Sequence, residues 1–281
     1  MKKAALLMAG VAIVAGAAMA GPGPDGDTLV IEGQEMVTEV KAPEGHPLDT
    51  IYSGWRFRKD ETQALETDDF ENPAMVAVDY ARDLWEEPMG ASAKSCADCH
   101  GDVEDSMAGF RANMPKWNEE AGKPWSLEHW VNWSIETHAE ADPWKWESPE
   151  MLAMTALIGL QSRGEPMGVQ TDGPMAEWIE KGKDLYYTRV GQLDMACSQC
   201  HEDNYGQMIR ADHLSQGNIN GFPTYRFKWS GLGSLHRRFS GCMKNIRAEP
   251  YKRGSDEFVA LEAYLASRGA GLSIETPSVR N

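Results

Sequence analysis

Cys96-Ala97-Asp98-Cys99-His100 and Cys197-Ser198-Gln199-Cys200-His201 are two copies of one pattern, C-x-x-C-H, and they decide the fold. The two thiols of each copy lie on one helical turn, where they can add to the two vinyl groups of a haem. The histidine that follows can then reach the iron from one side. Two copies with the histidine in place argue against disulfides or a zinc site. The pattern predicts two covalently attached haem c groups, with Cys96, Cys99, Cys197 and Cys200 as attachment points and His100 and His201 as axial ligands.

Both motifs belong to an internal repeat. Asp83-Leu84-Trp85 lies 13 residues before Cys96, and Asp184-Leu185-Tyr186 lies 13 residues before Cys197. Downstream, residues 160–164 resemble residues 265–269, at an offset of 105 instead of 101. A repeat of this length, with one haem in each copy, predicts two tandem domains instead of a solenoid.

Helical periodicity and helix-boundary residues define the elements of each copy. We expect helices over 73–85, 126–138, 148–162, 173–187 and 255–267, several of them opened by Ser or Pro and ended by Gly. No convincing alternating strand is present. The predicted fold class is all-α, with two tandem class I cytochrome c-like domains over 72–170 and 171–281. Residues 21–71 are rich in Gly, Pro and acids, and predict an irregular N-terminal arm packed on the domains.

The start of the chain has the features of a secretory signal peptide. Met1-Lys2-Lys3 is positive, a short apolar run follows, and Ala18-Met19-Ala20 is an A-x-A cleavage pattern. We therefore expect cleavage after Ala20, export to the periplasm, and no membrane span in the mature chain. The mature chain would carry 25 basic and 43 acidic residues. Such an acidic protein is a poor candidate for nucleic-acid binding.

Cys242 has no partner once four cysteines hold haem. An inert buried thiol or an intermolecular disulfide is one interpretation. The segment 236–253, however, contains six Lys or Arg residues and a single acid, Glu249. Positive neighbours lower the pKa of a thiol and attract small dianions. The segment also occupies the part of the second copy where a cytochrome supplies its second axial ligand.

The second copy carries further blocks that resemble a known family. They include Gly182–Tyr186, Arg189–Leu193, Ser215-Gln216-Gly217, Asn220–Pro223, Leu232–Phe239, Arg247–Pro250 and Gly271–Pro277. Together with Cys242 they resemble the SoxA family, the dihaem subunits of the SoxAX cytochromes of bacterial thiosulfate oxidation. The resemblance is densest over 175–281 and looser through the first haem domain.

The resemblance implies an activity and a set of residues. Cys242 would be both the far axial ligand of the second haem and the catalytic cysteine, which the family carries as a persulfide. Arg238 would bind thiosulfate, and Arg247 is a second candidate. The enzyme would be an L-cysteine S-thiosulfotransferase, which joins thiosulfate to a cysteine of a SoxYZ-type carrier and passes two electrons to a SoxX-type monohaem cytochrome in a heterodimer.

The first haem departs from the family pattern. Many dihaem relatives carry a Cys on the helix after the first motif as the far ligand, and Ser134 stands there instead, although Ser is a very poor iron ligand. His138 lies one helical turn further along the same face, so we expect His100 and His138 as the axial pair. His129 is the second choice, followed by Met107, Met114, Met151 and Met154. A catalytic role for this haem is in doubt.

Two other functions compete with the thiosulfotransferase. One is a dihaem thiosulfate dehydrogenase that couples two thiosulfates into tetrathionate and needs no carrier protein. The other is a pure electron-transfer cytochrome without an active site. An essential Cys242 and a requirement for a carrier thiol separate the three hypotheses.

Overall fold

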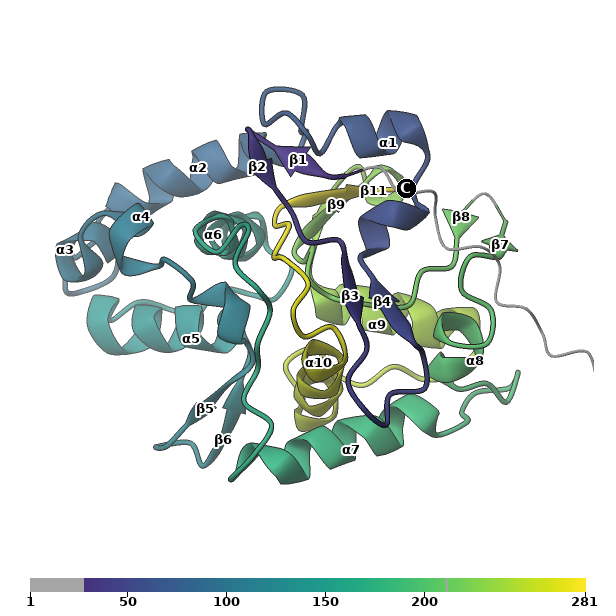
Figure 1. Ribbon diagram of the computed structural model, residues 1–281. Coiled ribbons are helices and arrows are strands. Elements are labelled where there is room, and N and C mark those ends of the chain that lie inside the picture. Colours follow the sequence, from purple (N-terminus) through teal and green to yellow (C-terminus); the bar gives the residue numbers. More distant parts are fainter. Residues whose placement is uncertain (1–27, 211) are drawn as a thin grey trace, which may run out of the picture.

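The computed structural model describes residues 28–210 and 212–281, so the predicted signal peptide lies outside the described residues. Two helical halves lie beside each other, and each is built on a pair of packed helices (Figure 1). Helix α2, Met75–Glu86, packs on α6, Pro149–Leu160, in the first half, and α7, Met175–Tyr187, packs on α10, Asp256–Arg268, in the second.

Short elements complete the first half between its two long helices. They are α3 Cys96–His100, α4 Val103–Ser106, the 3-10 turn η2 Arg111–Asn113, the hairpin β5 Lys116–Asn118 and β6 Lys123–Trp125, α5 Leu127–Ser134 and the π-helix η3 Ile135–Ala139. Apolar side chains of α2, α5 and α6 form one core. Nine of the twelve residues of α6 are buried, because this helix is covered on all sides.

The second half contains the only three-stranded sheet of the described residues. Its order is β10-β9-β11, with β10 antiparallel and β11 parallel to β9. The elements of this half are α7, α8 Cys197–His201, β7 Met208–Ile209, β8 Asp212–His213, β9 Thr224–Arg226, η4 Phe227–Trp229, β10 Gly231–Gly233, α9 Leu235–Asn245, α10 and β11 Ser278–Arg280. Strands of three residues are too short to show a detectable alternation, which is why the sequence did not reveal the sheet.

The predicted arm has local order of its own. It contains β1 Val30–Ile31, β2 Gln34–Glu35, β3 Glu39–Lys41, β4 Thr50–Tyr52, η1 Gly54–Phe57 and α1 Asp60–Ala64. Glu66 is fully buried, and its carboxylate accepts hydrogen bonds from Val279 N (2.8 Å) and Arg280 Nη1 (2.5 Å). The arm therefore packs on the C-terminal strand β11 of the second half.

Helix boundaries follow the residues that predicted them, with small shifts. Ser148 caps α6 by accepting from Met151 N (3.3 Å), and Pro149 stands in its first turn. The first helix begins at Met75 instead of Pro73, because Asn72 Oδ1 accepts from Ala74 N (3.0 Å) and holds a turn there. Gly182 in α7 allows close packing, since a Cβ there would lie 2.0 Å from Ala260 O of α10.

A ring stack, a hydrogen bond and an ion pair join the two halves. Trp146 of the first half stacks on His236 of α9, with ring centroids 4.8 Å apart and planes at 8°. Glu147 accepts a hydrogen bond from Ser234 N (3.3 Å) and lies 3.7 Å from Arg237. The core of the second half also includes Ala112, Met167 and Val169 from residues we assigned to the first domain.

The chain also returns to its first half at the C-terminal end. Residues 271–277 run along it, with Met167 N donating to Leu272 O (2.8 Å), Gly164 N to Ile274 O (2.9 Å) and Asn72 Nδ2 to Pro277 O (2.9 Å). The two halves are therefore joined by backbone bonds as well as by side chains.

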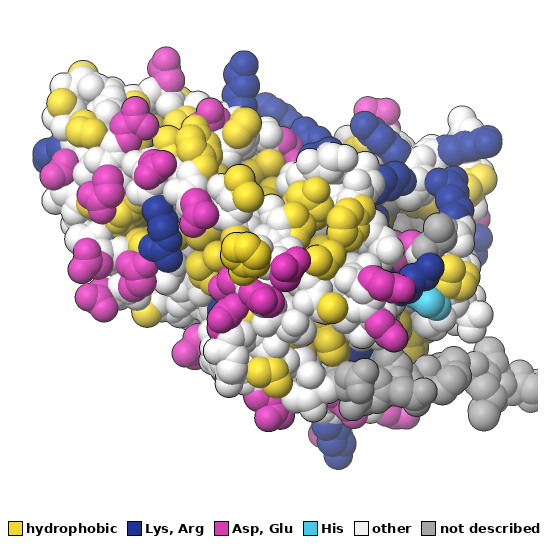
Figure 2. All heavy atoms as spheres, turned by 90° about the horizontal axis from the view of Figure 1, so that it is seen from above, with side chains coloured by type: hydrophobic (Ala, Val, Ile, Leu, Met, Phe, Trp, Pro, Cys, Tyr) yellow, Lys and Arg dark blue, Asp and Glu magenta, His cyan; other side chains and the backbone are white. Residues whose placement is uncertain are grey.

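Charge divides unequally between the halves. Residues 72–170 carry 17 acidic and 7 basic side chains, whereas residues 171–281 carry 13 acidic and 14 basic ones. Figure 2 shows acidic groups spread over the left of the molecule and Lys and Arg side chains gathered at the right. Within the described residues, no helix is both long and apolar enough to cross a bilayer.

Candidate functional site

The first C-x-x-C-H motif forms α3 at the edge of a cavity. Ser95 and Asp98 close a capping box, with Ser95 Oγ accepting from Asp98 N (3.1 Å) and Asp98 Oδ2 accepting from Ser95 N (2.8 Å). Trp85 Nε1 donates to Gly101 O (2.9 Å), which fixes the residue after His100. These bonds hold both thiols and the imidazole on one short helix.

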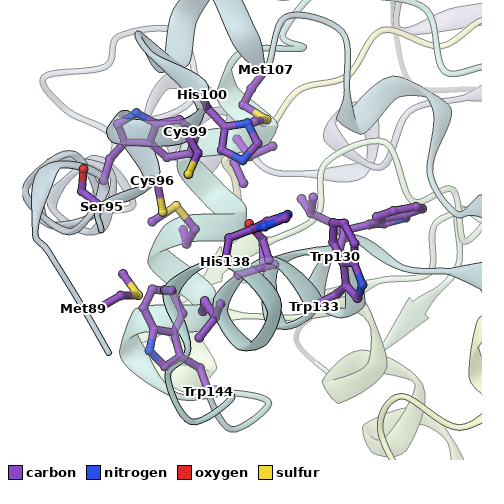
Figure 3. A pocket seen from close by; sticks show the side chains of 18 of the residues that line it. Met89, Ser95, Cys96, Cys99, His100, Met107, Trp130, Trp133, His138 and Trp144 are labelled. Atoms are coloured by element: carbon purple, nitrogen blue, oxygen red, sulfur yellow. The ribbon is translucent and has the colours of Figure 1, made fainter. Parts of the chain in front are cut away.

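The cavity beside α3 has a volume of about 250 Å³ (Figure 3). His100 and His138 both line it, and the pKa of His100 is lowered by burial and by the nearby charge of His138. Ser134 also lines it, as do Met107 and Met154. His129 does not, because its Nε2 contacts Gly254 O (3.2 Å) at the junction with the second half.

His138 reaches this cavity from a π-helical turn. Helix α5 ends at Ser134 and continues as the π-helix Ile135–Ala139, a rare geometry that is frequent at functional sites. The Trp133 ring lies edge-on to the imidazole of His138, at 5.1 Å and 85°. We expected one continuous α-helix to His138, and the structure instead has a last turn that contains more residues, as π-helical i→i+5 bonding requires.

The cavity fits a haem. Its wall is mostly aromatic and aliphatic, and Cys96 and Cys99 stand at its edge (Figure 3). The indole N–H of Trp130 is buried without a partner among the described residues, and Lys116 lies on the same wall. A haem carries apolar faces and two carboxylates, so an unpaired donor and a cation are the groups that its propionates need.

The second motif brings two predicted site residues together. His201 of α8 uses Nδ1 to donate to Ser215 O (2.7 Å), which leaves Nε2 free. The Cys242 thiol of α9 lies within hydrogen-bonding reach of this imidazole. A metal-ligating His almost always donates its other nitrogen to a carbonyl in this way. The pair His201 and Cys242 therefore fits the two axial positions of a haem iron.

The carbonyl of Ser215 can approach His201 only because a glycine follows. Gly217 has φ +80°, and a Cβ there would lie 3.0 Å from Cγ of the imidazole. Any other side chain would be strained by its backbone and by this contact. The Ser215-Gln216-Gly217 block thus orients the histidine.

The electrostatics of Cys242 differ from those of the motif cysteines. Burial raises its pKa, but the charge of Arg238, the hydrogen bond and charge of His201, and the charge of Arg226 outweigh burial and lower the pKa to about 6. Burial raises the pKa of Cys96 to about 11 and that of Cys197 to about 12. Cys242 is thus the thiol favoured as thiolate, and none of the five cysteines forms a disulfide.

The two predicted arginines are placed differently. Arg238 stands four residues before Cys242 on α9, hence on the same face, and has the largest favourable effect on its thiolate. Arg247 is exposed, and the strongest charged influences on Cys242 are Arg238, His201 and Arg226 instead. Arg226 was not among the predicted residues, because it precedes the basic segment 236–253 in sequence.

The same turn precedes both motifs. Gly90 and Gly191, 101 residues apart, have φ +64° and +74°. A Cβ on Gly90 would lie 2.0 Å from Ala139 O, and one on Gly191 would lie 2.4 Å from Ile246 O. Gly90 therefore packs against the residue after His138, and Gly191 packs against the end of the helix that carries Cys242. In each half, the turn before the motif contacts the segment that supplies the second predicted ligand.

Comparisons with known proteins agree with this geometry. Residues 80–167 and 181–274 each match the family model described as the SoxA/TsdA cytochrome c domain. The chain is thus a c-type cytochrome, a class that holds haem c covalently, and its predicted mostly helical cytochrome c fold is confirmed.

More particularly, the chain belongs to the SoxA family. It is 52% identical over 277 residues to the L-cysteine S-thiosulfotransferase subunit SoxA of Rhodovulum sulfidophilum, covering 96% of each chain. It is 53% identical over 274 residues to that of Paracoccus pantotrophus, covering 95% of this chain and 93% of the relative. The crystal structure of SoxXA from P. pantotrophus superposes with a TM-score of 0.88 at 52% identity, over 92% of this chain and 100% of that one.

Proposed function

We propose that this protein is the catalytic subunit of an L-cysteine S-thiosulfotransferase. It would join thiosulfate to a cysteine thiol of a SoxYZ-type carrier protein, in line with the name its relatives carry. A sulfur–sulfur bond forms, the carrier thiol releases one proton, and two electrons leave. The product is a cysteine S-thiosulfonate on the carrier.

The observation that carries this proposal is the setting of Cys242. Its sulfur is within hydrogen-bonding reach of His201, and the charges of Arg238 and Arg226 favour its thiolate form. A lowered pKa makes this sulfur a nucleophile at neutral pH, and an arginine fork binds a dianion with charge-assisted hydrogen bonds. Sulfur chemistry and electron removal can thus occur at one atom.

Each half would hold one haem c, giving two per chain. Cys96 and Cys99 would attach the first, with His100 and His138 as axial ligands. Cys197 and Cys200 would attach the second, with His201 and Cys242. When bound, haem supplies an electron acceptor next to the reacting sulfur. The residues of the chain bind the anion, hold the thiolate and orient the histidine.

The electrons need an outlet beyond this chain. A SoxX-type monohaem cytochrome in a heterodimer is the proposed acceptor, supported by the SoxXA structure, which covers nearly all of this chain. The signal-peptide pattern supports export to the periplasm, with cleavage after Ala20.

The test is turnover of the haem-loaded complex with and without a carrier thiol. The proposal predicts that thiosulfate reduces the complex rapidly only when a SoxYZ-type carrier is present, and that the carrier gains the mass of a thiosulfonate group. Equal rates without carrier, with tetrathionate as product, would assign the chain to the thiosulfate dehydrogenases instead. Mass spectrometry of the isolated chain would count haems and locate the mature N-terminus.

A further inference from the structure

Two arginines share one carboxylate close to a third arginine, Arg238, whose charge acts on Cys242. Arg58 from the arm and Arg226 from β9 both pair with Asp212 of β8. Arg238 of α9 forms no hydrogen bond or ion pair with any described side chain, and its charge acts on both Arg58 and Arg226. Asp212 therefore compensates one of the three arginine charges, and Arg58 joins the other two from a distant part of the sequence.

Arg226 is held rigidly, and it still has one nitrogen to offer. It is only 6% exposed, its Nε donates to Asn281 O (2.7 Å), and its Nη2 donates to Asp212 Oδ2 (3.2 Å). Its guanidinium also lies over the Trp229 ring, 5.1 Å from the centroid. Its Nη1 has no hydrogen-bond partner in the described part of the chain. This atom is not one of the fully buried side-chain atoms that lack a partner, so it is accessible from outside the protein.

Asp212 is held in turn by the arm. Arg58 Nη1 pairs with Asp212 Oδ1, and Arg58 Nη2 donates to His213 O (2.8 Å). Each oxygen of this carboxylate thus bonds a different arginine, so Asp212 fixes where Arg226 lies. This arrangement leaves no freedom for Asp212 to neutralise Arg238 as well.

Arg226 and Cys242 also influence each other electrostatically. The charge of Arg226 favours the Cys242 thiolate, and Cys242 in turn favours charged Arg226. Burial and the charge of Arg238 lower the pKa of Arg226 to about 10, so its guanidinium is still positive at neutral pH. The charges of Arg226 and Arg238 thus both act on the reactive sulfur, and each guanidinium keeps N–H groups without a partner in the described part of the chain.

We propose that Arg226 is a second substrate-binding residue beside Arg238, that the two form a site for a tetrahedral sulfur-containing dianion, and that Asp212 is its positioning residue. This inference rests on the proposed function of Cys242. Two guanidinium groups match the two negative charges of thiosulfate, and the buried, pre-oriented fork of Arg226 recognises an oxyanion better than a mobile lysine does.

The test uses the haem-loaded chain in complex with its partner cytochrome. Arg226→Gln removes the charge and keeps the length of the side chain. Arg237→Gln is the matched control, since Arg237 also lies over Trp229 (4.5 Å) but pairs with Glu147 at the junction of the two halves. Asp212→Asn tests the positioning role, and Arg226→Lys keeps the charge without the fork if the Gln variant folds poorly.

Two measurements decide the outcome. In turnover with carrier, Arg226→Gln should raise the KM for thiosulfate by about 10-fold or more with a much smaller change in kcat, because a charged hydrogen bond is lost. Calorimetric titration with sulfate, a dianion that donates no electrons, should show the same loss of affinity. Asp212→Asn should raise KM less, and Arg226→Lys should recover part of the loss.

Other outcomes would overturn the inference. They are a KM and a sulfate affinity for Arg226→Gln equal to those of Arg237→Gln, or a fall in kcat alone. Wild-type protein that binds sulfate but does not turn over thiosulfate with carrier would refute the proposed function and leave the anion site standing. The two ideas therefore fail separately.

Discussion

The sites of the two C-x-x-C-H motifs are alike on the side of the motif and differ on the opposite side. Each has a C-x-x-C-H helix preceded by a glycine turn that touches the opposite segment. That segment offers His138 from a π-helix in the first half and Cys242 from α9 in the second. The charges of Arg238 and Arg226 favour the thiolate of Cys242 in the second site, whereas the first half is strongly acidic. The two sites thus share their attachment residues and differ in the segment opposite them.

Cys242→Ala should have the largest effect on this contrast. Without the sulfur, the second site resembles the first, so thiosulfate turnover with carrier should fall by about 10⁴-fold or more. Haem content and the spectrum of the first haem should stay as in the wild type, and Ser240→Ala on the same helix is the control. Retained turnover, after any shift in haem potential is allowed for, would make the chain an electron carrier.

Arg238→Ala should have the next largest effect. Removal of the unpaired guanidinium should lower kcat/KM for thiosulfate by about 100-fold, with both haem spectra nearly unchanged. Lys244→Ala, an exposed charge on the same helix, should cost little. The same assay on Arg247→Ala tests the other predicted arginine. A large loss there would show that the exposed residue takes part in binding.

The shared turn predicts equal effects in both halves. Gly90→Ala and Gly191→Ala each place a methyl group against a carbonyl oxygen at positive φ, so each should lower the free energy of unfolding by about 2 kcal/mol. Denaturant unfolding of the haem-loaded protein measures this. Each variant should also disturb the spectrum of its own haem. A disturbance confined to one half would mean that the two turns have diverged in function.

His138→Ala should change turnover least. The first site has no counterpart of Cys242 or Arg238, so thiosulfate turnover should stay close to that of the wild type. The low-temperature EPR signal of the first haem should change from the form typical of two imidazole ligands, while the thiolate signal of the second persists. His129→Ala is the matched control, because His129 faces the junction of the halves and not the cavity. An unchanged first-haem signal in His138→Ala would point to another ligand.

Features that depend on residues close together in the sequence could be predicted from it. Features that depend on tertiary contacts could not. Both motifs, the repeat and most helix boundaries follow from residues close together in the chain, such as Ser148 and Pro149 at the start of α6. Arg226 and Arg58 belong to the site only because β8, β9 and the arm converge on Asp212. No spacing in one sequence signals that convergence. The π-helical turn at His138 also depends on packing around the cavity, and not on propensity.

The return of residues 271–277 to the first half changes how this duplication should be understood. A cut after residue 170 would remove the strand-like partner of residues 164–167 and would take Ala112, Met167 and Val169 out of the core of the second half. Neither half would therefore keep all of its hydrogen bonds and core contacts if it were separated from the other. The two repeats are therefore expected to unfold together, because each supplies hydrogen bonds or core residues that the other needs.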